Sequence, residues 1–186
     1  TGLVVELGGP RSGGEVVARY LERVRAVTHG RTPVGVRVAH TSLHGVGHQL
    51  LSLALDQLPG VDATAVATQC VPDPDFPTVA SPNPEEPGAL DHLLALASEI
   101  GADVAVALDP DADRLAVALP RRTGGTTAWQ QLTGDEVGAL LAADLLDATA
   151  AVSTPADRLL VTTVVSSRLV PAMALAAGVH HEVTLT

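Results

Sequence analysis

Three aspartates at alternate positions form the clearest chemical pattern in the sequence. They lie in the run Asp109-Pro110-Asp111-Ala112-Asp113-Arg114, directly after the apolar stretch 103–108. Ligands of open α/β sheets bind beyond the carboxyl ends of the strands, where alternate side chains of a looped segment can converge on one point. Two like charges about 4 Å apart repel by about 4 kcal/mol at an effective dielectric of about 20, and a divalent cation removes that repulsion.

The ligand types indicate which cation such a loop would hold. Asp109, Asp111 and Asp113 offer hard oxygen ligands, and no histidine or cysteine stands beside them in the sequence. This donor set favours Mg²⁺ over zinc. Arg114 adds a planar cationic fork that fits a pair of phosphate oxygens. The run therefore points to a magnesium and phosphate site at the end of a strand.

The same run has competing explanations. On spacing alone, a solvated acidic turn between two strands explains it equally well, and this alternative stays open. An EF-hand loop is excluded, because Arg114 stands where that loop needs glycine and Pro120 stands where it needs glutamate. A phosphatase with Asp109 or Asp111 as its nucleophile is disfavoured, because such enzymes place their paired aspartates after the first strand of the fold.

Three histidines are a second candidate for chemistry. His40, His44 and His48 are spaced four residues apart, which on one helix would give a metal-binding face. Gly45 and Gly47 interrupt that helix, so we do not expect the three side chains to share a face. We expect structural roles for His40 and His48, and a place near the functional cleft for His44.

Alternating helix and strand patterns must position the acidic run. Apolar stretches typical of strands fall at 34–39, 63–67, 103–108, 115–119, 159–165 and 182–185. Apolar residues at helical spacing fall at 12–24, 50–55, 89–100, 133–145 and 169–177. This alternation predicts an α/β fold in which the stretch at 103–108 is a strand buried on both faces.

Local signals mark where several of these elements begin and end. Capping-box pairs, Ser12 with Glu15 and Thr133 with Glu136, predict two helix starts, and Gly101 stands where a helix should end. Residues 71–87 are dense in proline and predict an extended loop. Residues 121–127 are polar and contain glycine, which predicts either a hairpin loop or a linker.

Composition excludes several classes of protein. The net charge is −10 over 186 residues, and no basic face is visible that could displace the counterions of a nucleic acid duplex. No apolar run is long enough to cross a bilayer. The single cysteine, Cys70, cannot form an intrachain disulfide and fits a reducing compartment. We therefore expect no nucleic acid partner, no membrane partner and a cytoplasmic location.

The acidic run resembles the metal loop of the α-D-phosphohexomutases, whose usual form is D-G-D-G-D-R. Pro110 and Ala112 replace the two glycines, which implies a stiffer loop. The segment 82–90 resembles one typical of the branch that contains longer phosphoglucomutases and phosphopentomutases. Further stretches resemble family segments in the family's order and extend the resemblance over nearly the whole chain, at 41–47, 76–79, 132–136, 164–168 and 184–186.

The resemblance implies an activity and roles for individual residues. Members move a phosphoryl group between the C1 and C6 (or C5) hydroxyls of a hexose or pentose phosphate, using a phosphoserine and Mg²⁺. By resemblance, Asp109, Asp111 and Asp113 bind Mg²⁺, and Arg114 contacts the phosphoserine phosphate or the substrate. Thr186 and His44 are implied to lie at the substrate.

Two parts of the family's machinery are not expected in this chain. The catalytic serine lies upstream in a motif such as T-A-S-H-N-P, and Ser81 does not match it because Pro82 replaces the histidine. We also do not expect the downstream domain that, in the family, grips the non-reacting phosphate of the substrate. Thr1 is not a methionine and the chain stops within an apolar alternating stretch, so we expect a fragment that is inactive when isolated.

The resemblance implies two domains. We expect residues 1–125 to form the family's domain II, a three-layer α/β/α sandwich with a mostly parallel mixed sheet. We expect residues 126–186 to form the first part of a similar domain III, with the remaining domains of the same polypeptide as partners. The alternative is a non-catalytic α/β module that binds Mg²⁺ or phosphate.

Overall fold

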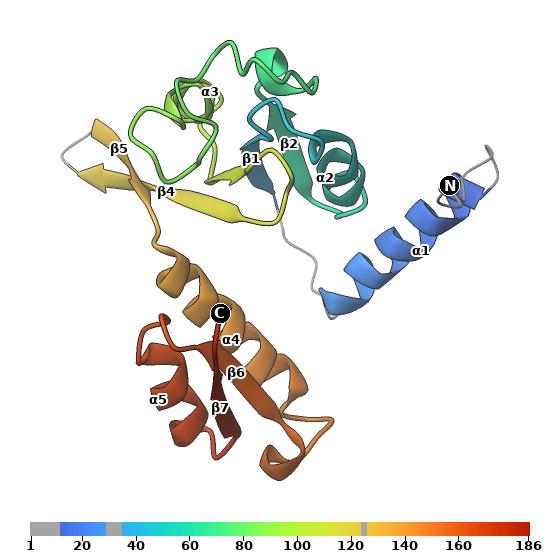
Figure 1. Ribbon diagram of the computed structural model, residues 1–186, viewed down its shortest axis with the longest axis vertical. Coiled ribbons are helices and arrows are strands. Elements are labelled where there is room, and N and C mark those ends of the chain that lie inside the picture. Colours follow the sequence, from blue (N-terminus) through green and yellow to red (C-terminus); the bar gives the residue numbers. More distant parts are fainter. Residues whose placement is uncertain (1–11, 29–34, 124–125) are drawn as a thin grey trace, which may run out of the picture. The chain divides into compact units, whose positions relative to one another are not determined.

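The computed structural model describes residues 12–28, 35–123 and 126–186 (Figure 1). The chain forms two compact units, Thr1–Gln130 and Gln131–Thr186. Among the described residues, no helix is both long enough and apolar enough to cross a membrane.

A mixed five-stranded sheet organises the first unit, with the strand order β2-β1-β3-β4-β5. β1 pairs in parallel with β2 and with β3, whereas β3 and β4 are antiparallel. The described elements are α1 (Ser12–Val27), β1 (Val36–Thr41), α2 (His48–Leu55), β2 (Val61–Ala65), a short 3₁₀ helix η1 (Ala67–Gln69), α3 (Asp91–Glu99), β3 (Val104–Leu108), β4 (Leu115–Thr123) and β5 (Thr126–Gln131). The predicted α/β class with a mostly parallel mixed sheet is confirmed.

Small side chains build the core between α3 and the sheet. Leu93 and Ala97 of α3 lie in one buried cluster with Ala105 and Ala107 of β3. We expected β3 to be buried on both faces, but its residues alternate between buried and half-buried. The buried alanines share one face with the α3 side chains, because successive strand side chains point to opposite faces, and the valines and Leu108 occupy the other.

The predicted end of α3 is confirmed. Gly101 has a φ of 61°, the left-handed conformation that glycine adopts without steric cost. The N–H of Ala102 then donates to the carbonyl of Ala97 at 2.8 Å, which satisfies a carbonyl of the last helical turn. This tight reversal returns the chain directly into β3, the strand that leads to the acidic run.

The polar stretch 121–127 was expected to be either a hairpin loop or a linker. The structure favours the hairpin, but most of the stretch belongs to the two strands. β4 continues to Thr123 and β5 begins at Thr126, so the two neighbouring strands flank residues 124–125, which lie outside the described residues. No strand was expected at 126–131. Its signal was weak because β5 has polar residues at most positions, and Trp129 supplies its contact with the core cluster.

The second unit contains two helices and a two-stranded parallel sheet. Its elements are α4 (Gly134–Thr149), a 3₁₀ helix η2 (Pro155–Asp157), β6 (Leu159–Thr163), α5 (Leu169–Ala176) and β7 (His180–Thr184). The capping box at the start of α4 is confirmed, with the Thr133 hydroxyl accepting from the Glu136 N–H and the Glu136 carboxylate accepting from the Thr133 N–H. The other predicted pair lies partly outside the described residues, because the side chain of Ser12 is not described.

Candidate metal and phosphate site

The acidic run forms a tight loop between β3 and β4. Leu108 and Leu115 are paired at the base of the loop, so its two ends are fixed by the antiparallel ladder. Within the loop, the Ala112 N–H donates to the Asp109 carbonyl at 3.0 Å, and Ala112 has a φ of 61°. A left-handed alanine is strained, which explains physically why glycine suits this position.

The loop brings the three carboxylates together. Asp109, Asp111 and Asp113 each offer one oxygen, and these oxygens lie within 4.8 Å of one another. Asp109 is buried at the base of the loop, whereas Asp111 and Asp113 are exposed. Because Asp111 and Asp113 are exposed, one side of the carboxylate cluster is open to solvent.

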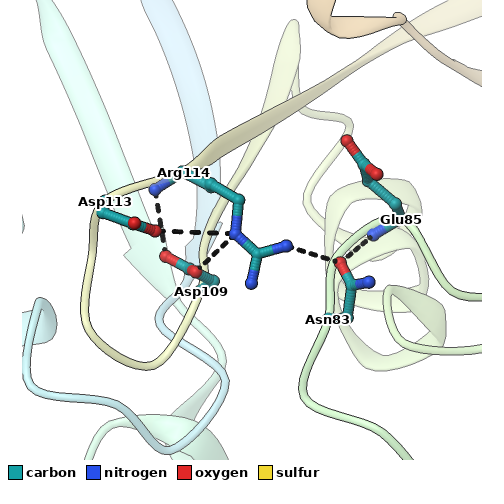
Figure 2. A network of polar contacts seen from close by, with 5 residues as sticks. All are labelled: Asn83, Glu85, Asp109, Asp113 and Arg114. Carbon is teal, nitrogen blue, oxygen red and sulfur yellow. Dashed lines mark hydrogen bonds and ion pairs between the residues drawn. The ribbon is translucent and has the colours of Figure 1, made fainter. Parts of the chain in front are cut away.

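Arg114 is bound to the buried member of this cluster (Figure 2). Its backbone N–H donates to Asp109 Oδ1 at 3.1 Å, and its Nε donates to Asp109 Oδ2 at 2.8 Å. Nε also lies 3.5 Å from Asp113 Oδ1. Both oxygens of Asp109 are therefore held by a single residue, which fixes the orientation of that carboxylate.

These contacts shift the pKa values of Asp109 and Asp113 in opposite directions. Burial raises the pKa of Asp109, but hydrogen bonds from the Arg114 N–H and guanidinium outweigh burial and leave this pKa below its ordinary value. The pKa of Asp113 is raised, first by its hydrogen bond with Asp109 and then by slight burial and by the charges of Asp111 and Asp109. Crowded carboxylates with this pattern gain from a cation that neutralises them.

A glycine-containing turn between β1 and α2 packs directly against the acidic loop. The Val46 N–H donates to the Pro110 carbonyl at 2.8 Å. A β-carbon on Gly45 would lie 2.3 Å from backbone atoms of Pro110, and one on Gly47 would lie 2.9 Å from the Ala112 β-carbon. Side chains at either glycine would push the loop away, so the two glycines permit the contact.

His44 lies in this turn but its ring is buried. The side chain is 4% exposed, and Nε2 is 2.8 Å from the Thr78 hydroxyl. The Gln69 side chain also reaches Thr78 and accepts from the Thr41 hydroxyl. This network anchors the proline-rich segment 71–87 to β1, and contact between His44 and a substrate stays a prediction.

The rings of the other two histidines, His40 and His48, stack on each other. His40 lies in β1 and His48 begins α2, with their rings stacked at a centroid separation of 5.8 Å. The His40 ring is buried, and its Nδ1 has no hydrogen-bond partner among the described residues. The expectation that the three histidines share no helix face is confirmed, because only His48 lies in a helix.

One neighbour of the site carried little chemical signal in the sequence. Asn83 Oδ1 accepts a hydrogen bond from Arg114 Nη1 at 3.3 Å, across 31 residues of chain. It lies in the proline-rich segment that was expected to be an extended loop, but nothing in the sequence spacing placed it beside the acidic loop. Thr186, by contrast, is exposed after β7 in the second unit, and its contact with a sugar stays a prediction.

Comparisons with known proteins identify the family. A family model described as phosphoglucomutase/phosphomannomutase, alpha/beta/alpha domain II, matches residues 18–124. This chain belongs to that family. The match ends just past the strand that follows the acidic loop, so the candidate site lies wholly within the matched region.

Similar proteins carry related names. A phosphopentomutase of Mus musculus is 43% identical over an alignment of 156 residues, covering 81% of this chain and 25% of that protein. A phosphoribomutase of Saccharomyces cerevisiae is 36% identical over 186 residues, covering 92% of this chain and 30% of that protein. The chain thus spans about a quarter of the length of the curated relatives that it matches.

A solved structure shares the fold. A phosphoglucomutase/phosphomannomutase family protein from Burkholderia thailandensis superposes with a TM-score of 0.69 at 21% identity, covering 92% of this chain and 33% of that one. The family membership expected from the sequence is confirmed by these findings.

Proposed function

We propose that this chain supplies the cation-binding part of a phosphosugar mutase. The reaction is the transfer of a phosphoryl group between the C1 hydroxyl and the C5 or C6 hydroxyl of a pentose or hexose phosphate. The phosphoserine that donates the group would come from outside this chain. The first unit, which ends at Gln130 rather than at the boundary of 125 expected from the sequence because β5 belongs to its sheet, would act as domain II, and the second unit as the first part of domain III.

The observation that supports this proposal most directly is the meeting of three carboxylates beside Arg114. Oxygens of Asp109, Asp111 and Asp113 lie within 4.8 Å of one another at the end of β3. Only oxygen ligands are present, which fits Mg²⁺. Bound there, Mg²⁺ would draw negative charge from phosphoryl oxygens and lower the barrier to transfer.

The chain's own residues would prepare this site in three ways. Asp109 is oriented by two hydrogen bonds from Arg114, so it needs no reorganisation to bind a cation. Asp111 and Asp113 are exposed and can close on the ion from solvent. The Arg114 side chain is 53% exposed, so its outer N–H groups can reach a phosphate.

The names of the relatives support a proposed substrate class. The phosphopentomutase and phosphoribomutase names point to a pentose phosphate, while the family as a whole includes mutases of hexose phosphates. The phosphoserine phosphate would lie against the cation with a free sugar hydroxyl placed to receive it, while the phosphate already on the sugar would be left to contacts outside this chain. We therefore expect negligible mutase turnover by the isolated chain.

Thermal unfolding with and without Mg²⁺ tests the cation site. At about 100 times its dissociation constant, a ligand of the folded state stabilises it by about 2.7 kcal/mol. Asp111→Ala should abolish this gain, whereas Asp62→Ala, which removes an exposed carboxylate from β2, should keep it. An unchanged wild-type midpoint would support the solvated acidic turn instead.

A further inference from the structure

Asn83 meets the acidic loop with its side chain already fixed. Its Oδ1 accepts a hydrogen bond from the Glu85 N–H at 3.1 Å, and its carbonyl accepts from the Glu86 N–H at 3.0 Å. The same Oδ1 accepts from Arg114 Nη1 at 3.3 Å (Figure 2). Because both partners of Oδ1 are donors, the oxygen and not the amide nitrogen faces Arg114.

The Arg114 guanidinium is consequently held by hydrogen bonds from two of its nitrogens, Nε and Nη1. On one side, Nε bonds Asp109 Oδ2 at 2.8 Å and lies 3.5 Å from Asp113 Oδ1. On the other side, Nη1 bonds Asn83. The side chain is half exposed, and a long exposed arginine keeps much rotamer freedom unless it is anchored at both ends.

The second anchor affects the carboxylates as well as the arginine. A guanidinium released from Asn83 can turn its fork onto Asp113 and Asp109, because two parallel N–H groups match a carboxylate. That arrangement would occupy the oxygens that a divalent cation needs and bring a positive charge closer to the cation. A neutral acceptor at Asn83 restrains the fork without cancelling its charge.

We infer that Asn83 is a positioning residue for the candidate cation site, and this inference rests on the function proposed above. Its side-chain oxygen holds the Arg114 guanidinium so that Nε, and not the two-nitrogen fork, faces Asp109 and Asp113. The outer N–H groups then stay available to a phosphate, and the oxygens of Asp111 and Asp113 stay available to the cation.

Nuclear magnetic resonance of the metal-free 186-residue chain tests the contact itself. Asn83 is the only asparagine in the chain, so asparagine-selective labelling gives one side-chain signal. We expect that signal to shift in Arg114→Lys, and the Arg114 side-chain nitrogen signals to shift and average in Asn83→Ala. Asn83→Asp, which keeps the acceptor oxygen, should restore restricted Arg114 signals. Glu85→Ala keeps the backbone donor and Asn83, so it should resemble the wild type.

Calorimetric titration of the same variants with Mg²⁺ tests the consequence. Asn83→Ala should weaken Mg²⁺ binding by roughly tenfold, at the lower end of effects seen for groups that orient metal ligands. In an Arg114→Ala background, Asn83→Ala should change nothing further, since its target is absent.

Two results would overturn the inference. One is an Arg114 spectrum that Asn83→Ala leaves unchanged. The other is an equal loss of Mg²⁺ affinity in the Arg114→Ala background, which would mean that Asn83 acts through the shape of its own turn. A wild-type chain that binds no Mg²⁺ would instead refute the proposed cation site, and the spectra would still decide whether Asn83 positions Arg114.

Discussion

Gly45 lies so close to Pro110 that a β-carbon on the glycine would come within 2.3 Å of the proline α-carbon and carbonyl oxygen. Two segments that are far apart in the sequence therefore touch backbone to backbone. One is the turn that starts α2 and the other is the acidic loop. The position of the carboxylates depends on this contact as well as on the β3–β4 hairpin.

Replacing Gly45 with alanine should displace the acidic loop. A contact with backbone atoms cannot be relieved by a rotamer change, so we expect a loss of about 1–3 kcal/mol in the free energy of unfolding. Mg²⁺ affinity should fall as well. Urea unfolding and calorimetric titration measure the two effects. Gly138→Ala, at a helical glycine with nothing within 4 Å of the added carbon, should be neutral or stabilising and serves as the control.

Ala112→Gly should be tolerated, in contrast with other alanine-to-glycine changes. A left-handed alanine costs roughly 1–2 kcal/mol, and glycine removes this cost but adds about 0.4–1 kcal/mol of entropy to the unfolded chain. The net change should lie between zero and about 1.6 kcal/mol of stabilisation. Ala143→Gly, inside α4, should destabilise by about 1 kcal/mol. Equal losses for both variants in thermal unfolding would contradict the assigned backbone conformation.

Alanine substitutions of Asp109 and Asp111 should differ in their effect on the stability of the metal-free protein. Asp109→Ala removes a buried carboxylate that accepts two hydrogen bonds from Arg114, so we expect a loss of about 2 kcal/mol in unfolding free energy. Asp111→Ala alters an exposed side chain and should stay within about 0.5 kcal/mol of the wild type. Both should lose Mg²⁺ stabilisation. The two-part result distinguishes a metal ligand from a residue that also holds the loop together.

Stability should fall as the pH is lowered through the range in which His40 titrates. Burial, followed by the nearby charge of His48 and against the opposing effect of Asp56, lowers the pKa of His40 from 6.5 to about 4. The unfolded chain then binds more protons below pH 6.5, so the contribution of the neutral ring is complete above this pH. It is lost as the pH falls toward about 4, up to about 3 kcal/mol in total.

A variant without a titratable ring checks this assignment. His40→Phe retains an aromatic ring against His48 but cannot bind a proton. The dependence of its unfolding free energy on pH between 6.5 and 4 should be shallower than that of the wild type. Parallel curves would mean that carboxylates elsewhere account for the whole effect.

Several features of the fold could be predicted because they depend on nearest neighbours along the chain. The capping box of Thr133 and Glu136, the left-handed Gly101 and the strand before the acidic loop are local patterns of this kind. The strand β5 and the one-sided burial of β3 were not predicted. Both depend on which elements cover each face of the sheet, and the sequence does not state that.

By itself the sequence determined that three carboxylates and one arginine follow a strand of an α/β protein, since spacing and the strand pattern are encoded locally. Only the tertiary structure decided that these carboxylates converge, that Gly45 supports their loop and that Asn83 holds Arg114. The contacts made by Gly45 and Asn83 join residues far apart in the chain. They arise where packing of separate elements brings donors, acceptors and close backbone contacts together, and no local spacing specifies such packing.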